Sequence, residues 1–243
     1  MALTSFELPS NLRRVNDTPY PFLIVDVATN IGLFVVVLFF FYCSYDVMCA
    51  YTNLLPTNSS VCTMTPLSLT PLSSLRVSRH QIPTFNRFPN TSLQHRPLLI
   101  YHSCFSPPPT PGIIESHLRS TGVVVPQWRY TMYSVSHFHS TTHEVLCVAS
   151  GRAKLCFGGE ENLKKVEAVI EKGDVIVIPA GVAHRLLQDF EGGFLMVGSY
   201  PVGTSWDMCY GKAGEEDRVE KIKDAGWFKR DPIYGDDGPA LHV

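Results

Sequence analysis

Charged residues are scarce in this chain of 243 residues, where they make up 17% against roughly 25% in an average soluble protein. The shortage is uneven: residues 1–95 contain no lysine and only 9 charged side chains, whereas residues 96–243 contain the other 33. The formal net charge of -2 leaves no basic face for a phosphate backbone. The sequence therefore predicts no nucleic-acid partner.

The seven cysteines lack a pairing pattern. Their number is odd and none of them forms a close CxxC pair, so neither a cysteine zinc site nor a disulfide scaffold is supported. Cys147 and Cys156 lie in apolar runs, where a reduced thiol packs as a small hydrophobic group. We therefore expect the C-terminal part of the chain to be reduced and intracellular.

Residues 1–51 are predicted to be an N-terminal extension with one apolar segment. Residues 27–45 carry no charge, and a helix needs about 20 apolar residues to cross a bilayer. This segment is a candidate transmembrane helix or signal anchor; a buried strand or an untranslated stretch is the alternative. If it spans a membrane, Arg13 and Arg14 predict a cytosolic N-terminus and a membrane-anchored protein. If it is absent or not functional, a cytoplasmic location is expected.

Residues 52–95 have a different composition, in which 23 of 44 residues are Ser, Thr, Pro or Asn. A stretch of this kind buries too little apolar surface to offset its chain entropy, so a disordered linker is predicted. Arg76, Arg79 and Arg87, in a segment without acidic residues, also suit an organellar presequence.

Residues 96–243 are predicted to form one all-β domain. Short apolar runs alternate with turns rich in glycine and proline, a spacing typical of a sandwich or barrel. The clearest runs are 145–148, 154–157, 175–178 and 194–197. A single short helix is expected near the C-terminus, opened by Glu215 and stopped by Gly226.

Three histidines and a glutamate in this domain have the spacing of a metal site. His137 and His139 are two residues apart, so in a strand their side chains share a face. A turn and the next strand bring Glu144 alongside, and a second strand and turn end at His184. Three imidazoles and one carboxylate suit a divalent transition metal, namely Mn, Fe or Zn, with Ni or Cu as further options.

These residues resemble the two sequence motifs of the cupin superfamily. The first motif, HxHx4Ex6G, is met by His137, His139, Glu144 and Gly151, and the second, Gx5PxGx2H, by Gly173, Pro179, Gly181 and His184. Thr131 and Gln188 depart from the usual glycine and asparagine, but neither position is a ligand. Within the superfamily, the chain looks most like the YjlB-like cupins, on the basis of segments 126–129, 139–146 and 198–201. This resemblance covers residues 96–243.

The resemblance implies an RmlC-like double-stranded β-helix, or jelly roll, with the metal inside the barrel. It implies His137, His139, His184 and Glu144 as ligands, with Glu144 also as the catalytic acid or base. The expected function is a metal-dependent enzyme on a small organic metabolite, of oxygenase, decarboxylase or isomerase type. A non-catalytic module that binds or senses a metal or small molecule is the alternative. A homodimer is also expected.

Residues near the motifs have weaker signals. Strand alternation places His143 opposite Glu144, as a surface or subunit-contact residue, with a fourth-ligand role as the alternative. Tyr133 and Val135 share the inward parity of His137, which suggests that Tyr133 lines the cavity or packs in the core.

Basic and aromatic side chains of the domain are expected to have ordinary structural roles. Lys154 and Arg185 are read as solvated, although either could bind a carboxylate substrate. Trp128, Trp206 and Trp227 are expected to pack in the core rather than stack on a substrate.

Overall fold

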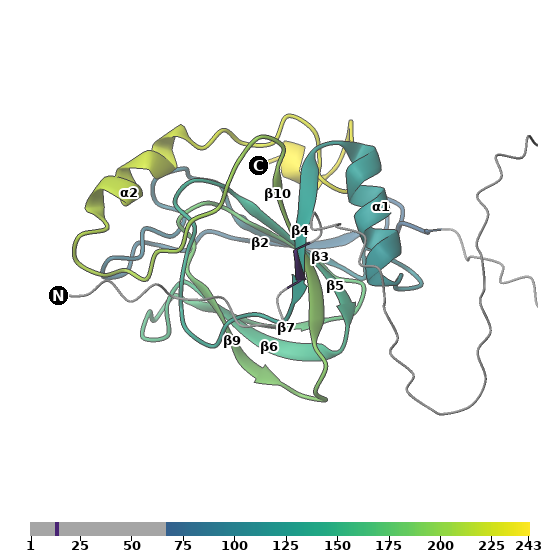
Figure 1. Cartoon of the computed structure of the whole chain (residues 1–243), viewed down its shortest axis with the longest axis horizontal. Helices are drawn as coiled ribbons and strands as arrows, with labels where there is room; N and C mark the ends of the chain where they lie inside the picture. The colour runs from purple at the N-terminus through teal and green to yellow at the C-terminus, as the bar shows by residue number, and fades with distance from the viewer. Residues whose placement is uncertain (1–12, 15–66) are drawn as a thin grey trace, which may run out of the picture. The chain divides into compact units, whose positions relative to one another are not determined.

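The computed structural model describes residues 13–14 and 67–243 (Figure 1). The strands are β1 (Arg13–Arg14), β2 (Arg76–His80), β3 (Leu98–His102), β4 (Val124–Tyr130), β5 (Glu144–Ser150), β6 (Arg152–Phe157), β7 (Val166–Glu171), β8 (Val175–Ile178), β9 (His184–Asp189) and β10 (Leu195–Pro201). The helices are α1 (Pro111–Thr121), α2 (Glu216–Lys221) and the 3-10 turns Ile222–Asp224 and Pro239–Leu241.

The strands form two antiparallel sheets, as a jelly roll requires. The larger sheet has the order β1-β4-β10-β5-β8-β3-β2, and the smaller has the order β7-β6-β9. In Figure 1 the smaller sheet lies below the larger one. Its Leu155, Phe157 and Ile170 pack against Leu146 and Ile176 of the larger sheet in one buried core. The prediction of an all-β domain is confirmed.

The central strands of the larger sheet are buried on both faces. In β8, Ile176 faces the core between the sheets, whereas Val175 and Val177 belong to a second core on the other face. That second core includes Ile114 and Leu118 of α1. Because both faces are covered, these strands are continuously apolar instead of alternating.

The predicted apolar runs coincide with β5, β6, β8 and β10, and the predicted C-terminal helix is α2. The sequence reasoning missed α1. Its signals were present, because Pro111 occupies a position at the helix start and Gly122 ends the helix with a φ of 67°. The candidate membrane segment 27–45 lies outside the described residues. Within the described ranges, no helix is long and apolar enough to cross a membrane.

The expected linker is wrong for residues 67–95, which belong to the β domain. Arg76 and Arg79 lie in β2, which pairs with β3 along its whole length. Asn90 is fully buried: its amide donates to the carbonyl of Pro83 at 2.8 Å, and its side-chain oxygen accepts the backbone N–H of Ala183 at 3.2 Å. The polar residues that suggested disorder therefore satisfy backbone groups of the domain.

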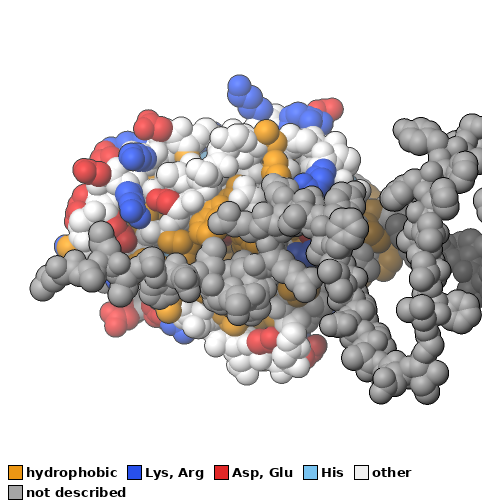
Figure 2. Space-filling view, viewed as in Figure 1, with side chains coloured by type: hydrophobic (Ala, Val, Ile, Leu, Met, Phe, Trp, Pro, Cys, Tyr) orange, Lys and Arg blue, Asp and Glu red, His pale blue; other side chains and the backbone are white. Residues whose placement is uncertain are grey.

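The described surface carries charges of both signs, which lie interspersed on the face drawn in Figure 2. Lys154 pairs with Glu167 at 2.5 Å, and Arg185 pairs with Glu160. Both basic groups thus have acidic partners on the smaller sheet and its turn. The absence of a nucleic-acid partner and the homodimer stay predictions.

Candidate metal centre

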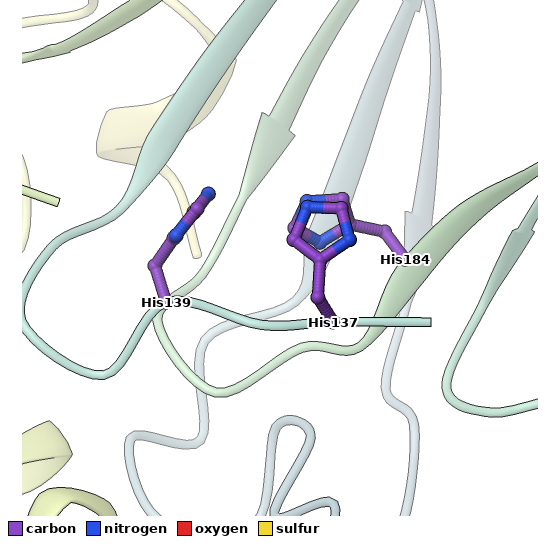
Figure 3. A group of neighbouring side chains, drawn as sticks. All are labelled: His137, His139 and His184. Carbon is purple, nitrogen blue, oxygen red and sulfur yellow. The ribbon is translucent and has the colours of Figure 1, made fainter. Parts of the chain in front are cut away.

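His137 and His184 lie opposite each other on two antiparallel segments. The His137 N–H donates to the His184 carbonyl at 3.2 Å, and the His184 N–H donates back to the His137 carbonyl at 2.8 Å. The two ring centroids are 4.3 Å apart. His137 and His139 were expected in a strand; they lie outside the regular strands, but the backbone bridge keeps both side chains pointing into one space (Figure 3).

One nitrogen of each of the three histidines lies within 4.8 Å of the others. The second nitrogen of each ring is held by the backbone. His137 Nδ1 donates to the Val135 carbonyl at 3.0 Å, and His184 Nδ1 donates to the Val182 carbonyl at 2.9 Å. His139 Nδ1 donates to the carbonyl of Asp207. A carbonyl only accepts, so Nδ1 carries the hydrogen and Nε2 keeps its lone pair in each neutral ring.

Glu144, the first residue of β5, completes the cluster. Its Oε1 accepts the Tyr200 hydroxyl hydrogen at 2.7 Å and lies 3.5 Å from His139 Nε2. Its Oε2 lies 3.3 Å from His184 Nε2 and has no hydrogen-bond partner. The side chain is buried, with 2% of the residue exposed. An unpartnered carboxylate oxygen at this depth requires a compensating positive charge.

The electrostatics of the cluster are those of a site for a cation. Burial, together with the nearby imidazoles of His184 and His139, lowers the pKa of His137 to about 3, so this ring is a neutral donor. Burial alone would raise the pKa of Glu144, but His139 and His184 hold it well below its usual value. Burial likewise opposes protonation of His139, yet Glu144 raises its pKa. A proton or a metal ion can serve as the cation between these groups, so the residues present fit a divalent metal.

Asp207 and Tyr200 support the cluster and were not assigned a role from the sequence. The Asp207 carboxylate accepts the backbone N–H of Ser140 at 2.7 Å and the Ser140 hydroxyl at 2.6 Å. This fixes the segment after β10 beside His139. Tyr200 accepts the indole N–H of Trp128 at 3.0 Å while it donates to Glu144. Both residues follow His139 by about 60 to 70 positions, so short-range spacing carries no signal for them.

His143 lies opposite Glu144, as strand alternation predicted, but not on the surface. It is 1% exposed and packs against the rings of Trp227 and Phe228. Its Nδ1 accepts the Ala180 backbone N–H at 3.0 Å. The expected surface position is wrong because the C-terminal segment covers this face of the larger sheet.

A cavity opens beside the three histidines. It encloses about 430 Å³ when its open mouth is included, and Glu144 and Tyr133 are among its lining residues. Tyr133 meets His137 edge-on, with centroids 5.5 Å apart. Trp128 and Trp206 also line it, whereas Val135 is 60% exposed and points away from the core. The alternation rule therefore holds for Tyr133 and fails for Val135, where the chain bends between β4 and His137.

Gly181 explains how the chain turns into His184. Its φ of 88° lies in the region that favours glycine, and a Cβ there would meet Pro89 at 3.1 Å and the Asn90 carbonyl oxygen at 3.2 Å. The turn residues of the second motif thus aim His184 inward.

Comparison with known proteins shows the family of the chain. A family model described as Cupin matches residues 118–189. The uncharacterized protein YjlB of Bacillus subtilis (strain 168) is 39% identical over 117 residues, which are 48% of this chain and 68% of the relative.

A comparison with solved structures finds the 7S globulin of Momordica charantia, with 16% identity, 46% of this chain covered and a TM-score of 0.30. This chain covers 32% of that globulin, about a third of its length. RmlC from Streptococcus suis, solved with dTDP-D-xylose, has 16% identity and a TM-score of 0.24, with 51% of this chain and 68% of RmlC covered. With the two motifs, the two-sheet fold and the YjlB relative taken together, the chain belongs to the cupin family, as a YjlB-like member.

Proposed function

We propose that His137, His139, Glu144 and His184 hold a divalent transition metal and that the protein is a metal-dependent enzyme acting on a small organic metabolite. One observation carries the proposal: the buried Glu144 Oε2 has no partner and faces imidazoles whose Nδ1 atoms are occupied by carbonyls. Three neutral nitrogens and one carboxylate oxygen favour Mn, Fe or Zn, and also accept Ni or Cu.

The residues around such an ion would have different roles. A bound divalent ion supplies Lewis acidity toward a carbonyl or carboxylate and, with Fe or Cu, access to oxygen chemistry. Tyr200 holds Oε1 of Glu144, which leaves Oε2 free to face the ion or to hold a proton as the catalytic acid or base. Apolar walls keep bulk water from the cluster. Oxygenase, decarboxylase and isomerase chemistries are all compatible with these parts.

A non-catalytic module that binds a small molecule or metal is the second candidate. It is favoured by the scarcity of carboxylates and amines: among the described residues that line the cavity, Glu144 is the one carboxylate, and there is no lysine, arginine or cysteine. Turnover separates the two candidates. Conversion of any substrate that stops when a chelator removes the metal, and returns when the metal is restored, favours the enzyme.

Elemental analysis of the full chain, purified without a metal-binding tag, tests the site itself. We expect about one equivalent of metal per chain and its loss in the double variant His137→Ala/His184→Ala. His242→Ala is the matched control, because it removes an exposed imidazole far along the chain from the motifs. Circular dichroism must show that the double variant is folded. Full metal content in that folded variant refutes the site.

A further inference from the structure

We propose that the cavity binds a small hydroxylated aromatic compound, with one oxygen directed at the metal position and a second polar group at Thr131. This inference rests on the proposed function, because the metal would lie at the base of the same cavity. It adds the chemical class of the ligand, which the walls of the cavity specify.

The walls next to the histidines are aromatic. Trp206 stacks on Tyr200 at an interplanar angle of 21° and meets His139 at a centroid distance of 5.9 Å. On the other side, Tyr133 lies edge-on to His137 and contacts Tyr130 at 5.7 Å. Aromatic rings favour stacked and edge-to-face contacts with other rings, so these walls prefer a planar ligand to a saturated one of equal size.

Three methionines complete the lining: Met132, Met196 and Met208. Thioether side chains adapt to irregular shapes and contact ring edges favourably. The cavity is open to solvent at its mouth, so about 430 Å³ is an upper bound on the space beside the histidines. The aromatic and thioether walls suit a small ligand with one planar ring.

The charge of the lining disfavours polyanions. No lysine or arginine is among the described lining residues, and Lys154 and Arg185 are paired with glutamates elsewhere. The proposed metal would meet one anionic group, but a second carboxylate or phosphate would have no cationic side chain to neutralise it and would lie near Glu144. A neutral or singly charged ligand avoids this cost.

Thr131 provides the second polar contact. It lines the cavity, and its buried Oγ1 has no hydrogen-bond partner among the described residues. Buried hydroxyl groups in folded proteins nearly always have a partner, which a polar substituent on the ligand would supply. A hydroxyl group suits this position because it can donate or accept.

The test is calorimetry on the zinc-loaded full chain with three probes: 4-hydroxybenzyl alcohol, its saturated analogue 4-(hydroxymethyl)cyclohexanol, and succinate. We expect the aromatic probe to bind at least about tenfold more tightly than the saturated one, with succinate weakest. Trp206→Leu should remove that preference. Thr131→Val should lower the affinity for the aromatic probe by about fivefold. Trp227→Phe is the control, because Trp227 packs on His143 outside the cavity lining.

Equal affinity for the first two probes, or tighter binding of succinate than of the aromatic probe, overturns the inference. If zinc is retained in that case, the proposed metal site is unaffected. If the protein does not retain zinc, the proposed function fails, and the metal-free protein decides the inference alone. Fluorescence quenching by the aromatic probe that is lost in Trp206→Leu and kept in Trp227→Phe then supports it. Absence of quenching overturns it.

Discussion

The hydroxyl of Tyr200 donates a 2.7 Å hydrogen bond to Oε1 of Glu144, and this bond divides the roles of the two carboxylate oxygens. Oε1 is satisfied by the protein, whereas Oε2 has no partner. The indole of Trp128 fixes the phenol in turn at 3.0 Å. A cavity-lining tryptophan is therefore connected through one tyrosine to the carboxylate of the candidate metal centre.

Replacing Tyr200 by Phe should weaken metal binding without removing a ligand. Groups that orient a ligand typically contribute 10–100-fold to metal affinity, so we expect a decrease of about that size. Competition with a chromophoric chelator measures it. Tyr210→Phe is the matched control, and equal zinc affinity in Tyr200→Phe and wild type would contradict the role assigned to Tyr200.

Asp207→Ala should also weaken metal binding, through His139. The carboxylate ties the segment after β10 to the backbone and hydroxyl of Ser140, and the Asp207 carbonyl holds the His139 ring. Loss of the carboxylate frees that carbonyl to move, so we expect metal affinity to fall by about tenfold or more.

Ser140→Ala should produce part of this loss of metal affinity, because it removes the hydroxyl contact and leaves the backbone N–H contact to Asp207. Its metal affinity should lie between those of wild type and Asp207→Ala. Asp237→Ala, at an exposed carboxylate, should bind metal normally. If Ser140→Ala binds metal more weakly than Asp207→Ala, the segment is held by other contacts.

Asn90→Ala should destabilise the whole domain. The change leaves the buried N–H of Ala183 without its acceptor and removes the amide donors to the carbonyls of Pro83 and Gly158. We expect the free energy of unfolding to fall by about 1–3 kcal/mol in urea titrations. Ser73→Ala, at an exposed position of the same segment, should change it by less than about 0.5 kcal/mol. Equal stability of the two variants would mean that residues 67–95 contribute little to the fold.

Cys104 should resist alkylation in the folded protein. Burial raises the pKa of its thiol to about 12, and only the thiolate reacts. Between about pH 7 and about pH 9, iodoacetamide labelling of Cys104 should stay negligible in the native state. In urea it should rise steeply with pH, because the pKa of an exposed thiol is about 8.5. Peptide mass mapping distinguishes the states. Native labelling that increases with pH as it does in urea would contradict the burial of this side chain.

The sequence predicted the cluster of His137, His139 and His184 because its information is local. Two histidines two residues apart share a side in any extended backbone, and turn residues before the third aim it toward them. The positions of Asp207, Tyr200 and Trp128 depend on strand pairing between distant segments, since β10 lies between β4 and β5. No spacing rule reports such contacts.

The errors have physical causes as well. Composition suggested a linker over residues 52–95, but a few well-placed polar groups, such as the Asn90 amide, hold residues 67–95 to the domain. His143 was placed at the surface because alternation gives the opposite face of β5 without saying what covers it. That face is covered by Trp227 and Phe228, which come some 80 residues later in the chain.

The three imidazoles are not oriented in the same way. Those of His137 and His184 bond to carbonyls two residues earlier in their own segments, so each is preset by its local backbone. The ring of His139 depends on Asp207, 68 residues further along the chain. The orientation of the third imidazole at the candidate metal centre therefore depends on long-range packing outside both motifs, whereas local backbone alone presets the other two.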